Sequence, residues 1–220
     1  MLPIDPEREV AGRSIAAVLM AKQIKQSGEI HAETLLTEIG ALAGFAAQMS
    51  IRKTMIEGQG LDADSILVEV VTKNDEKYYF SDVLNWILFE NMNSPPYSIW
   101  AYVSAAVPED LRLFVPDISA IVSNAARTIG TRRFGVPRVP PAHVPRKLPR
   151  VALDEHWRSV QDELTATRRH PSEWPYDLAA AAQWQMVTSR DGLPPHIAAG
   201  IIMEAAIPMS KIDPNAVPGA

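Results

Sequence analysis

The stretch Ile39–Ile51 carries no charged residue and is apolar on every side of a helix. A surface helix has a polar face, so a helix with this pattern is expected to be buried. Its thirteen residues are too few to cross a bilayer, which takes about 20. We therefore predict a central core helix over about residues 31–57 and no membrane-spanning segment.

Capping residues and apolar positions at helical spacing predict further helices on both sides of this one. Asp5 and Pro6 suit a helix start, and Gly28 suits a left-handed helix end. The short connection to the central helix predicts that the two helices pack as an antiparallel hairpin. The remaining helices are expected over residues 81–90, 95–107, 117–130, 154–164, 174–186 and 196–207.

One β-hairpin is predicted over about residues 66–80. Ile66–Thr72 is rich in β-branched residues, a charged turn follows, and Tyr78–Phe80 returns as a second strand. An isolated hairpin is marginal in water, so it must lie on helices or pair with a strand of another subunit. The second option favours a homodimer over a monomer.

These elements predict a mainly α-helical protein, a globular bundle around a central buried helix. Residues 1–135 form a helical core domain with the hairpin. Residues 136–150 hold five prolines, which exclude regular structure and indicate a basic strap or linker. Residues 151–210 form helices that pack on the core, and residues 211–220 form a loose tail.

Composition excludes several classes of chemistry. The chain has no cysteine, which excludes disulfides, thiolate metal sites and cysteine nucleophiles. The N-terminus lacks the basic start and apolar run of a signal peptide, so a cytoplasmic location is expected. Residues 118–153 hold seven basic and no acidic residues. Because the whole chain carries −5, its remainder carries −12.

The basic part of the chain, residues 127–150, has two interpretations. Arg132 and Arg133 directly follow a predicted helix and suit a phosphate, another anionic ligand or an acidic partner. Phe134 is the only interleaved aromatic residue, and the acidic remainder of the chain also argues against nucleic acid. We favour the second interpretation, in which a basic strap lies on the protein's own acidic surface.

Gly40 and Gly44 lie one turn apart on the central helix. Each glycine costs about 1 kcal/mol against alanine in a helix interior. Their placement therefore suggests that something approaches the backbone closely there. A neighbouring helix is the favoured interpretation. A ligand or a second subunit over these glycines is the alternative.

Polar residues on apolar helices are the candidates for acid–base catalysis. Asp82 and Asn85 lie one turn apart on one helix, and His196 and Glu204 lie on the last helix. A buried carboxylate must be paired or shifted in pKa, and such groups concentrate at functional sites. We favour the more ordinary explanation, in which Asp82 and Asn85 cap or face water and Glu204 pairs with an arginine or lysine.

Known sequence motifs add no further site. The five histidines include no pair at a spacing of three or four, so no helix supplies two imidazoles and no metal site is expected. The glycines of Gly130–Gly135 have P-loop separation, but the required lysine and the preceding strand are missing. There is no Gly-x-Ser-x-Gly elbow. We expect no cofactor.

The function favoured by the sequence is a non-enzymatic binding or interaction protein, whose partner is a protein or a small ligand. One alternative is a hydrolase or lyase that uses Glu204, His196 or Asp82 as acid or base. The other is a binder of anionic ligands or nucleic acid through residues 127–150. Whether the protein is an enzyme stays open at this point.

Overall fold

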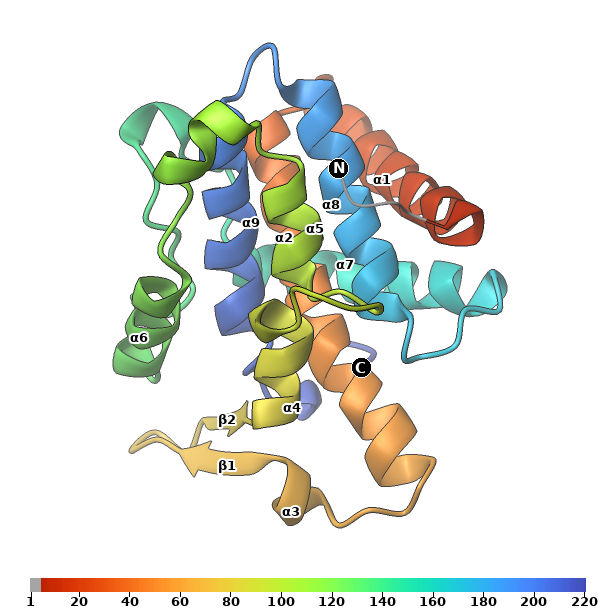
Figure 1. Ribbon diagram of the computed structural model, residues 1–220. Coiled ribbons are helices and arrows are strands. Elements are labelled where there is room, and N and C mark those ends of the chain that lie inside the picture. The colour runs from red at the N-terminus through yellow and green to blue at the C-terminus, as the bar shows by residue number, and fades with distance from the viewer. Residues whose placement is uncertain (1–4) are drawn as a thin grey trace.

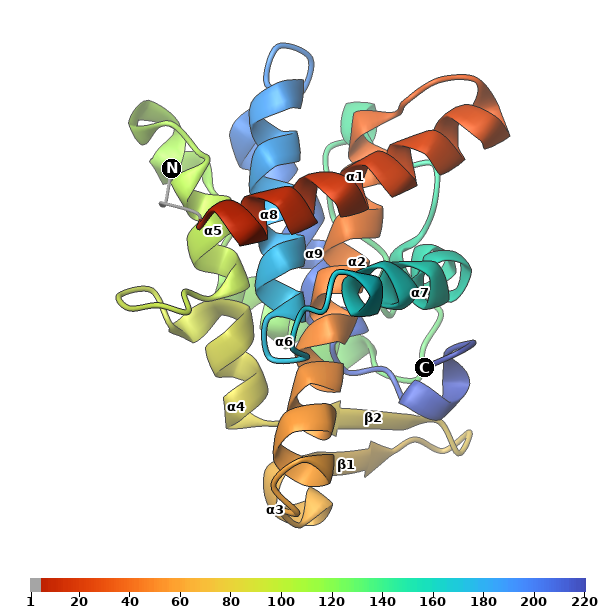
Figure 2. The same cartoon turned by 90° about the vertical axis from the view of Figure 1, so that its right-hand side faces the viewer.

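The structure is a computed structural model that describes residues 5–220. The first four residues of the predicted core domain lie outside this range. Within it the chain forms nine α-helices and one two-stranded antiparallel sheet (Figures 1 and 2). The prediction of a mainly α-helical bundle with one hairpin is confirmed.

The helices differ in length. The long helices are α1 (Pro6–Ser27), α2 (Ala32–Ile51), α7 (Pro149–Ala166), α8 (Trp174–Ser189) and α9 (Pro195–Met209). The short helices are α3 (Ala63–Ile66), α4 (Asp82–Asn85), α5 (Ile99–Ala105) and α6 (Ile118–Thr128). The π-helical turns η1 (Arg52–Glu57) and η2 (Trp86–Glu90) extend α2 and α4, and 3₁₀ turns form η3 (Glu109–Phe114), η4 (Pro141–His143) and η5 (Pro214–Ala216).

The ends of α1 show how local sequence starts and stops a helix. The Arg8 backbone N–H donates to the Asp5 carboxylate at 2.9 Å, which satisfies one free donor of the first turn. Gly28 takes a φ of 80° and donates its N–H to the Ile24 carbonyl at 2.8 Å. Both predicted caps are confirmed.

Helix α2 is the centre of the molecule, and α7, α8 and α9 pack against it. Every residue from Thr34 to Ile51 is buried, and Leu42 and Phe45 are fully covered. The continuous helix Ala32–Glu57 is longer than its charge-free stretch and is long and apolar enough to cross a bilayer. Its apolar window is wholly buried among the other helices, as in a core helix.

Helix α9 lies directly on the glycines of α2. A Cβ at Gly40 would meet the Ile202 carbonyl oxygen at 2.6 Å, and a Cβ at Gly44 would meet the Ala206 carbonyl oxygen at 1.9 Å. This contact is the tightly packed neighbouring helix of the favoured interpretation. The alternative, a ligand or second subunit over Gly40 and Gly44, is wrong, because the α9 backbone already occupies that space.

The hairpin joins β1 (Val68–Val71) to β2 (Lys77–Phe80), and β2 lies on the helical body. The Tyr78 and Phe134 rings pack edge to face with centroids 4.9 Å apart. The Arg52 guanidinium, from η1, stacks over the Tyr79 ring at 4.3 Å. Strand β1 is the outer strand, and all of its residues are exposed.

The C-terminal residues 211–220 were expected to form a loose tail, but the structure packs the first part of this segment and Val217 against the body. Lys211, Ile212 and Val217 are buried. The Tyr79 N–H donates to the Lys211 carbonyl at 2.9 Å. The physical reason is that the edge of β2 facing away from β1 has backbone groups that need hydrogen-bond partners, and residues 211 and 212 supply them.

The proline-rich strap crosses from α6 to α7 and lies on the acidic end of α2. The Arg146 backbone N–H donates to Thr34 Oγ1 at 2.9 Å, and His143 Nδ1 lies 3.0 Å from a Glu33 carboxylate oxygen. Helix α7 begins at Pro149 and not at Asp154, because proline suits the first position of a helix. Asp154 lies inside α7 and pairs with Arg150, one turn earlier.

Candidate functional site

Glu204, the buried carboxylate that the sequence singled out on α9, is held by an arginine. Arg138 Nε donates to its Oε1 at 2.9 Å, and a terminal guanidinium nitrogen lies 2.8 Å from the same oxygen. Burial raises the pKa of Glu204 above its usual value, and the Arg138 guanidinium opposes that effect. The arrangement is an ion pair that allows a carboxylate inside the core.

The other acid–base candidates do not join Glu204. His196 lies two turns earlier on α9, roughly 12 Å along the helix axis, and packs near the Phe114 ring. Asp82 is exposed in the first turn of α4, and Asn85 is half-buried one turn later. Helix α4 lies beside the hairpin, whereas the α8–α9 connection lies at the opposite end of the bundle (Figure 1). The hydrolase or lyase hypothesis required these groups to converge, and they lie apart.

A buried ionic cluster that sequence reasoning missed joins α1 to α8. Arg169 forks onto Asp177, with both nitrogen–oxygen distances at 2.9 Å. Arg8 donates to the Tyr102 hydroxyl at 2.7 Å and pairs with Glu173. Asp177 is the only charged residue within α8. A lone carboxylate on an otherwise uncharged helix is the same sequence pattern that pointed to Glu204, and it could have identified Asp177.

The electrostatics of this cluster indicate a closed structural contact. Burial raises the pKa of Asp177 to about 6, against the opposing effect of Arg169 and Arg8. Burial also raises the pKa of Tyr176 to about 12. Asp177 is fully covered by protein, so a ligand cannot reach its carboxylate. The cluster therefore connects helices and offers no open reaction site.

A second buried network fixes the strap to α2. The Glu38 carboxylate accepts hydrogen bonds from Gln23 Nε2 at 2.9 Å and from Lys147 Nζ at 3.0 Å, and His156 Nε2 lies 3.3 Å away. Burial acts to raise the pKa of Glu38, but the bonds from His156, Gln23 and Lys147 outweigh it and lower that pKa. The network is filled by the protein's own groups.

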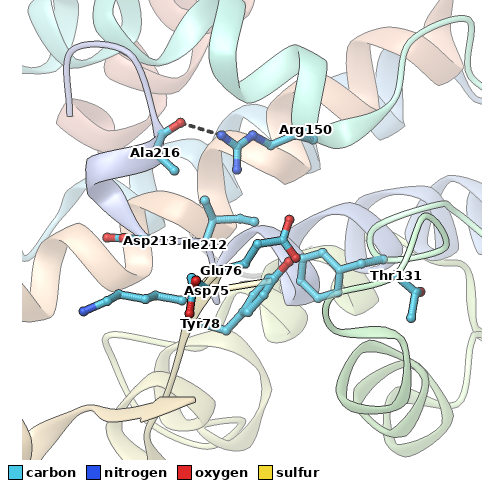
Figure 3. Close-up of a pocket in the computed structure, with 10 residues that line it drawn as sticks. Asp75, Glu76, Tyr78, Thr131, Arg150, Ile212, Asp213 and Ala216 are labelled. Atoms are coloured by element: carbon cyan, nitrogen blue, oxygen red, sulfur yellow. Dashed lines mark hydrogen bonds between the residues drawn. The ribbon is translucent and has the colours of Figure 1, made fainter. Parts of the chain in front are cut away.

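A pocket of about 430 Å³ lies beneath the hairpin turn (Figure 3). Tyr78 and Ile212 line it, with Glu76 and Asp213 as acidic groups and Arg150 at its edge. Arg150 donates to the Ala216 carbonyl, as Figure 3 shows, and to the Asp154 carboxylate at 3.0 Å. Burial raises the pKa of Tyr78, so its hydroxyl keeps its proton at neutral pH.

The Tyr78 hydroxyl of this pocket keeps its proton at neutral pH, because burial raises its pKa, so it is not poised as a nucleophile. Its one guanidinium is already occupied by the chain itself. Among residues 5–220, no three histidine, aspartate or glutamate side chains gather in an arrangement that could hold a metal ion. The pocket therefore carries no specific chemistry that we can assign.

An open depression of about 870 Å³ lies at the end of α6 and is lined by four arginines. We call it the arginine depression; its basic residues are Arg127, Arg132, Arg133 and Arg138. Gly130, with a φ of 69°, turns the chain after α6. The following turns place Arg132 and Arg133 beside Arg127 of the helix.

The arginines of this depression differ from the other basic residues of the same segment. Arg146, Lys147 and Arg150 each pair with a carboxylate of this chain. Arg127, Arg132 and Arg133 are exposed, and within residues 5–220 they form no ion pair with a carboxylate. Arg138, the fourth arginine of the depression, pairs with Glu204. The strap half of the basic segment thus lies on acidic groups, whereas the first half faces solvent.

The arginine depression is the candidate site because three of its arginines, Arg127, Arg132 and Arg133, are accessible and have no carboxylate partner within residues 5–220. Sequence reasoning identified Arg132 and Arg133, and the tertiary structure added Arg127 and Arg138. A function has to be argued from this geometry, because no protein-family model, no curated protein and no solved structure matches the chain.

Proposed function

We propose that this is a non-enzymatic binding protein that holds an acidic segment of a partner protein in the arginine depression. One observation carries the proposal. Arg127, Arg132 and Arg133 have no carboxylate partner within residues 5–220, although the chain as a whole carries a net charge of −5. Acidic groups are abundant, and these three guanidinium groups are left for an external anion.

The chemistry of arginine supports an anionic partner. A guanidinium stays charged at any physiological pH and presents a planar set of donors that fits a carboxylate through two parallel hydrogen bonds. Guanidinium groups gathered around one depression repel one another, and a bound anion relieves that repulsion. Arg138 is partly neutralised by Glu204, so Arg127, Arg132 and Arg133 supply the attraction.

The shape of the depression favours a peptide segment over a small molecule. Pockets for small ligands bury most of the ligand and are lined mainly by apolar groups. The arginine depression is open, and all four of its arginines stand at exposed positions. Among residues 5–220, no aromatic side chain lines the depression, so it lacks the stacking surface that single-stranded nucleic acid commonly uses.

The test measures binding of a fluorescently labelled oligoglutamate peptide by anisotropy at low ionic strength. We expect saturable binding that weakens as salt is added, because exposed charges are screened. The double substitution Arg132→Glu and Arg133→Glu should raise Kd by about tenfold or more, which corresponds to about 1.4 kcal/mol.

A matched control reverses the same number of charges elsewhere. Arg158→Glu with Arg190→Glu changes two exposed arginines on α7 and on the α8–α9 connection, and should change Kd by less than about twofold. Equal losses in both double variants, or no peptide binding by the unaltered protein, would refute the proposal. Tighter binding of a single-stranded oligonucleotide than of the peptide would contradict the assigned partner class.

A further inference from the structure

The outer edge of β1 is open, and this is independent of the arginine depression. In the part of the chain that the structure describes, strand β1 pairs only with β2, whose other edge is closed by Lys211 and Ile212. Within residues 5–220 no strand lies along the far edge of β1 (Figure 2). An open strand edge is a template for pairing with another chain.

The register of the hairpin shows which backbone groups are free. The Thr72 N–H donates to the Glu76 carbonyl at 2.9 Å, and Val70 lies opposite Tyr78. Hydrogen-bonded pairs recur at every second residue of an antiparallel ladder, so Val70 turns its backbone groups toward β2. Glu69 and Val71 therefore point their N–H and C=O groups away from the hairpin.

This edge lacks the lysine, the proline and the bulge that protect many edge strands from pairing; the protective features it has are its shortness and the charge of Glu69. Protected edges carry lysine, proline, a bulge or a covering element. Strand β1 consists of three valines and Glu69, and Val68 and Val71 are 61% and 52% exposed. The Glu69 charge is compensated within the hairpin, because its carboxylate accepts hydrogen bonds from Lys77 at 3.2 Å and Tyr79 at 2.9 Å.

We propose that a second copy of this chain pairs its β1 with this edge, antiparallel about a two-fold axis at Val70. In this register Glu69 lies opposite Val71 of the second copy. Because Glu69 and Val71 are equally spaced from Val70, both free donors and both free acceptors of each copy find partners. Edge pairing then forms four backbone hydrogen bonds and a continuous four-stranded sheet.

The side chains fit this self-pairing. Val70 shares a face of the sheet with Tyr78, so the two copies form an apolar row in which the two Val70 side chains meet at the axis and a Tyr78 flanks each of them. On the other face each Glu69 keeps its own Lys77, so no uncompensated like charge is brought across the axis. A two-fold pairing needs such an uncharged, self-complementary centre, and this is why a second copy is the assigned occupant.

The absence of cysteine makes the register directly testable. Val70→Cys introduces a single thiol at the axis. Directly opposite residues of a non-hydrogen-bonded antiparallel pair have Cα atoms about 4.5 Å apart, within the range of a disulfide. We expect Val70→Cys to form a disulfide-linked dimer under mild oxidation. Val68→Cys is the control, because its two copies would lie roughly 13 Å apart along the strands.

A second variant tests the edge without a new covalent bond. Val71→Pro removes an outward N–H and leaves the hydrogen bonds between β1 and β2 in place. Edge pairing of two short strands is a small interface, so we expect a dimer that forms with rising concentration, up to about 100 µM, in sedimentation analysis. The proline variant should stay monomeric with an unchanged circular dichroism spectrum.

Three results would overturn the inference. The first is a mass that stays monomeric over the whole concentration range. The second is cross-linking of Val68→Cys as fast as that of Val70→Cys. The third is a dimer of Val71→Pro as stable as that of the unaltered chain.

Discussion

Gly44 and Gly200 are both helical glycines of this bundle, yet their surroundings are opposite. A Cβ at Gly44 would lie 1.9 Å from the Ala206 carbonyl oxygen, whereas a Cβ at Gly200 would meet no atom within 4 Å. Gly44 is therefore needed for the approach of α9 to α2. Gly200 makes no such close contact, and it destabilises its helix because glycine loses more conformational entropy on folding than alanine does.

We predict that Gly44→Ala lowers the free energy of unfolding by about 3 kcal/mol or more, because backbone must move to admit the methyl group. Gly200→Ala should instead raise it by about 0.5–1 kcal/mol, the difference in helix propensity. Urea denaturation followed by circular dichroism measures both. A Gly44→Ala protein as stable as its parent would show that α2 and α9 pack less closely than described.

Lys211 is a buried amine, and its titration should be visible in stability. Burial lowers the pKa of Lys211 from 10.5 to about 8, and its ammonium lies 5.1 Å from the Phe80 ring centroid. Between about pH 8 and 10.5 the unfolded chain binds more protons at this residue than the folded chain. The contribution of Lys211 therefore makes the protein more stable as pH rises through this window.

Lys211→Met should accordingly stabilise the protein at pH 7 by about 2–3 kcal/mol, since it removes the desolvation of the buried ammonium. The gain should shrink toward pH 10, where the folded amine is already neutral. Urea denaturation of both proteins across this pH range checks the prediction. If Lys211→Met raised the free energy of unfolding equally at pH 7 and at pH 10, titration of Lys211 would be excluded as the cause.

At the scale of elements, one lysine connects the proline-rich strap to the central helix. Lys147 donates to Glu38 at 3.0 Å, and the Glu38 side chain is fully covered while that of Lys147 is 15% exposed. The nearby pair of Arg146 and Glu29 is more than half exposed on both sides. Removing one partner of a buried ion pair costs far more stability than removing one partner of an exposed pair. The Lys147–Glu38 contact should therefore contribute more to the free energy of unfolding than the Arg146–Glu29 contact.

We predict that Lys147→Met lowers the free energy of unfolding by about 2–4 kcal/mol, because Glu38 stays buried with one donor fewer. Arg146→Met, the matched control, should change it by less than about 1 kcal/mol. Combining Lys147→Met with Glu38→Gln should cost less than the sum of the two single changes. Additive costs would mean that these two side chains do not interact.

The whole molecule shares one hydrophobic core, although its sequence suggests separate parts. Residues on α1, α2, α7, α8 and α9 belong to the same buried cluster. Phe45 of α2 packs edge to face on Trp157 of α7 with ring centroids 4.8 Å apart. Residues 1–135 without the later helices would expose the faces of α2 that α7, α8 and α9 cover.

We therefore predict that the chain unfolds in a single cooperative transition. Tryptophan fluorescence, which reports on Trp157 among others, and circular dichroism should give the same midpoint. A chain that ends at residue 135 should not give a cooperative transition, because it loses most of the apolar cover of α2. Two separate midpoints in the full chain would instead indicate independently folding parts.

Local patterns in the sequence were sufficient for the elements that depend on near neighbours. The charge-free run after Glu38 predicts a buried helix because burial follows from side-chain chemistry repeated at helical spacing. The caps at Asp5 and Gly28 and the hairpin turn involve residues within a few positions of one another. The close contact at Gly40 and Gly44 was also recognisable, although its partner helix was not.

Pairings between distant residues could not be predicted in this way. Glu204 could be recognised as a buried carboxylate, but its partner Arg138 lies 66 positions away. Glu38 and His156 lie 118 positions apart and meet only because α7 crosses α2. The C-terminal residues looked loose in the sequence and are ordered because they complete the edge of β2. Chain chemistry thus sets which residues are buried, and the packing of helices sets which of them meet and which arginines are left facing solvent.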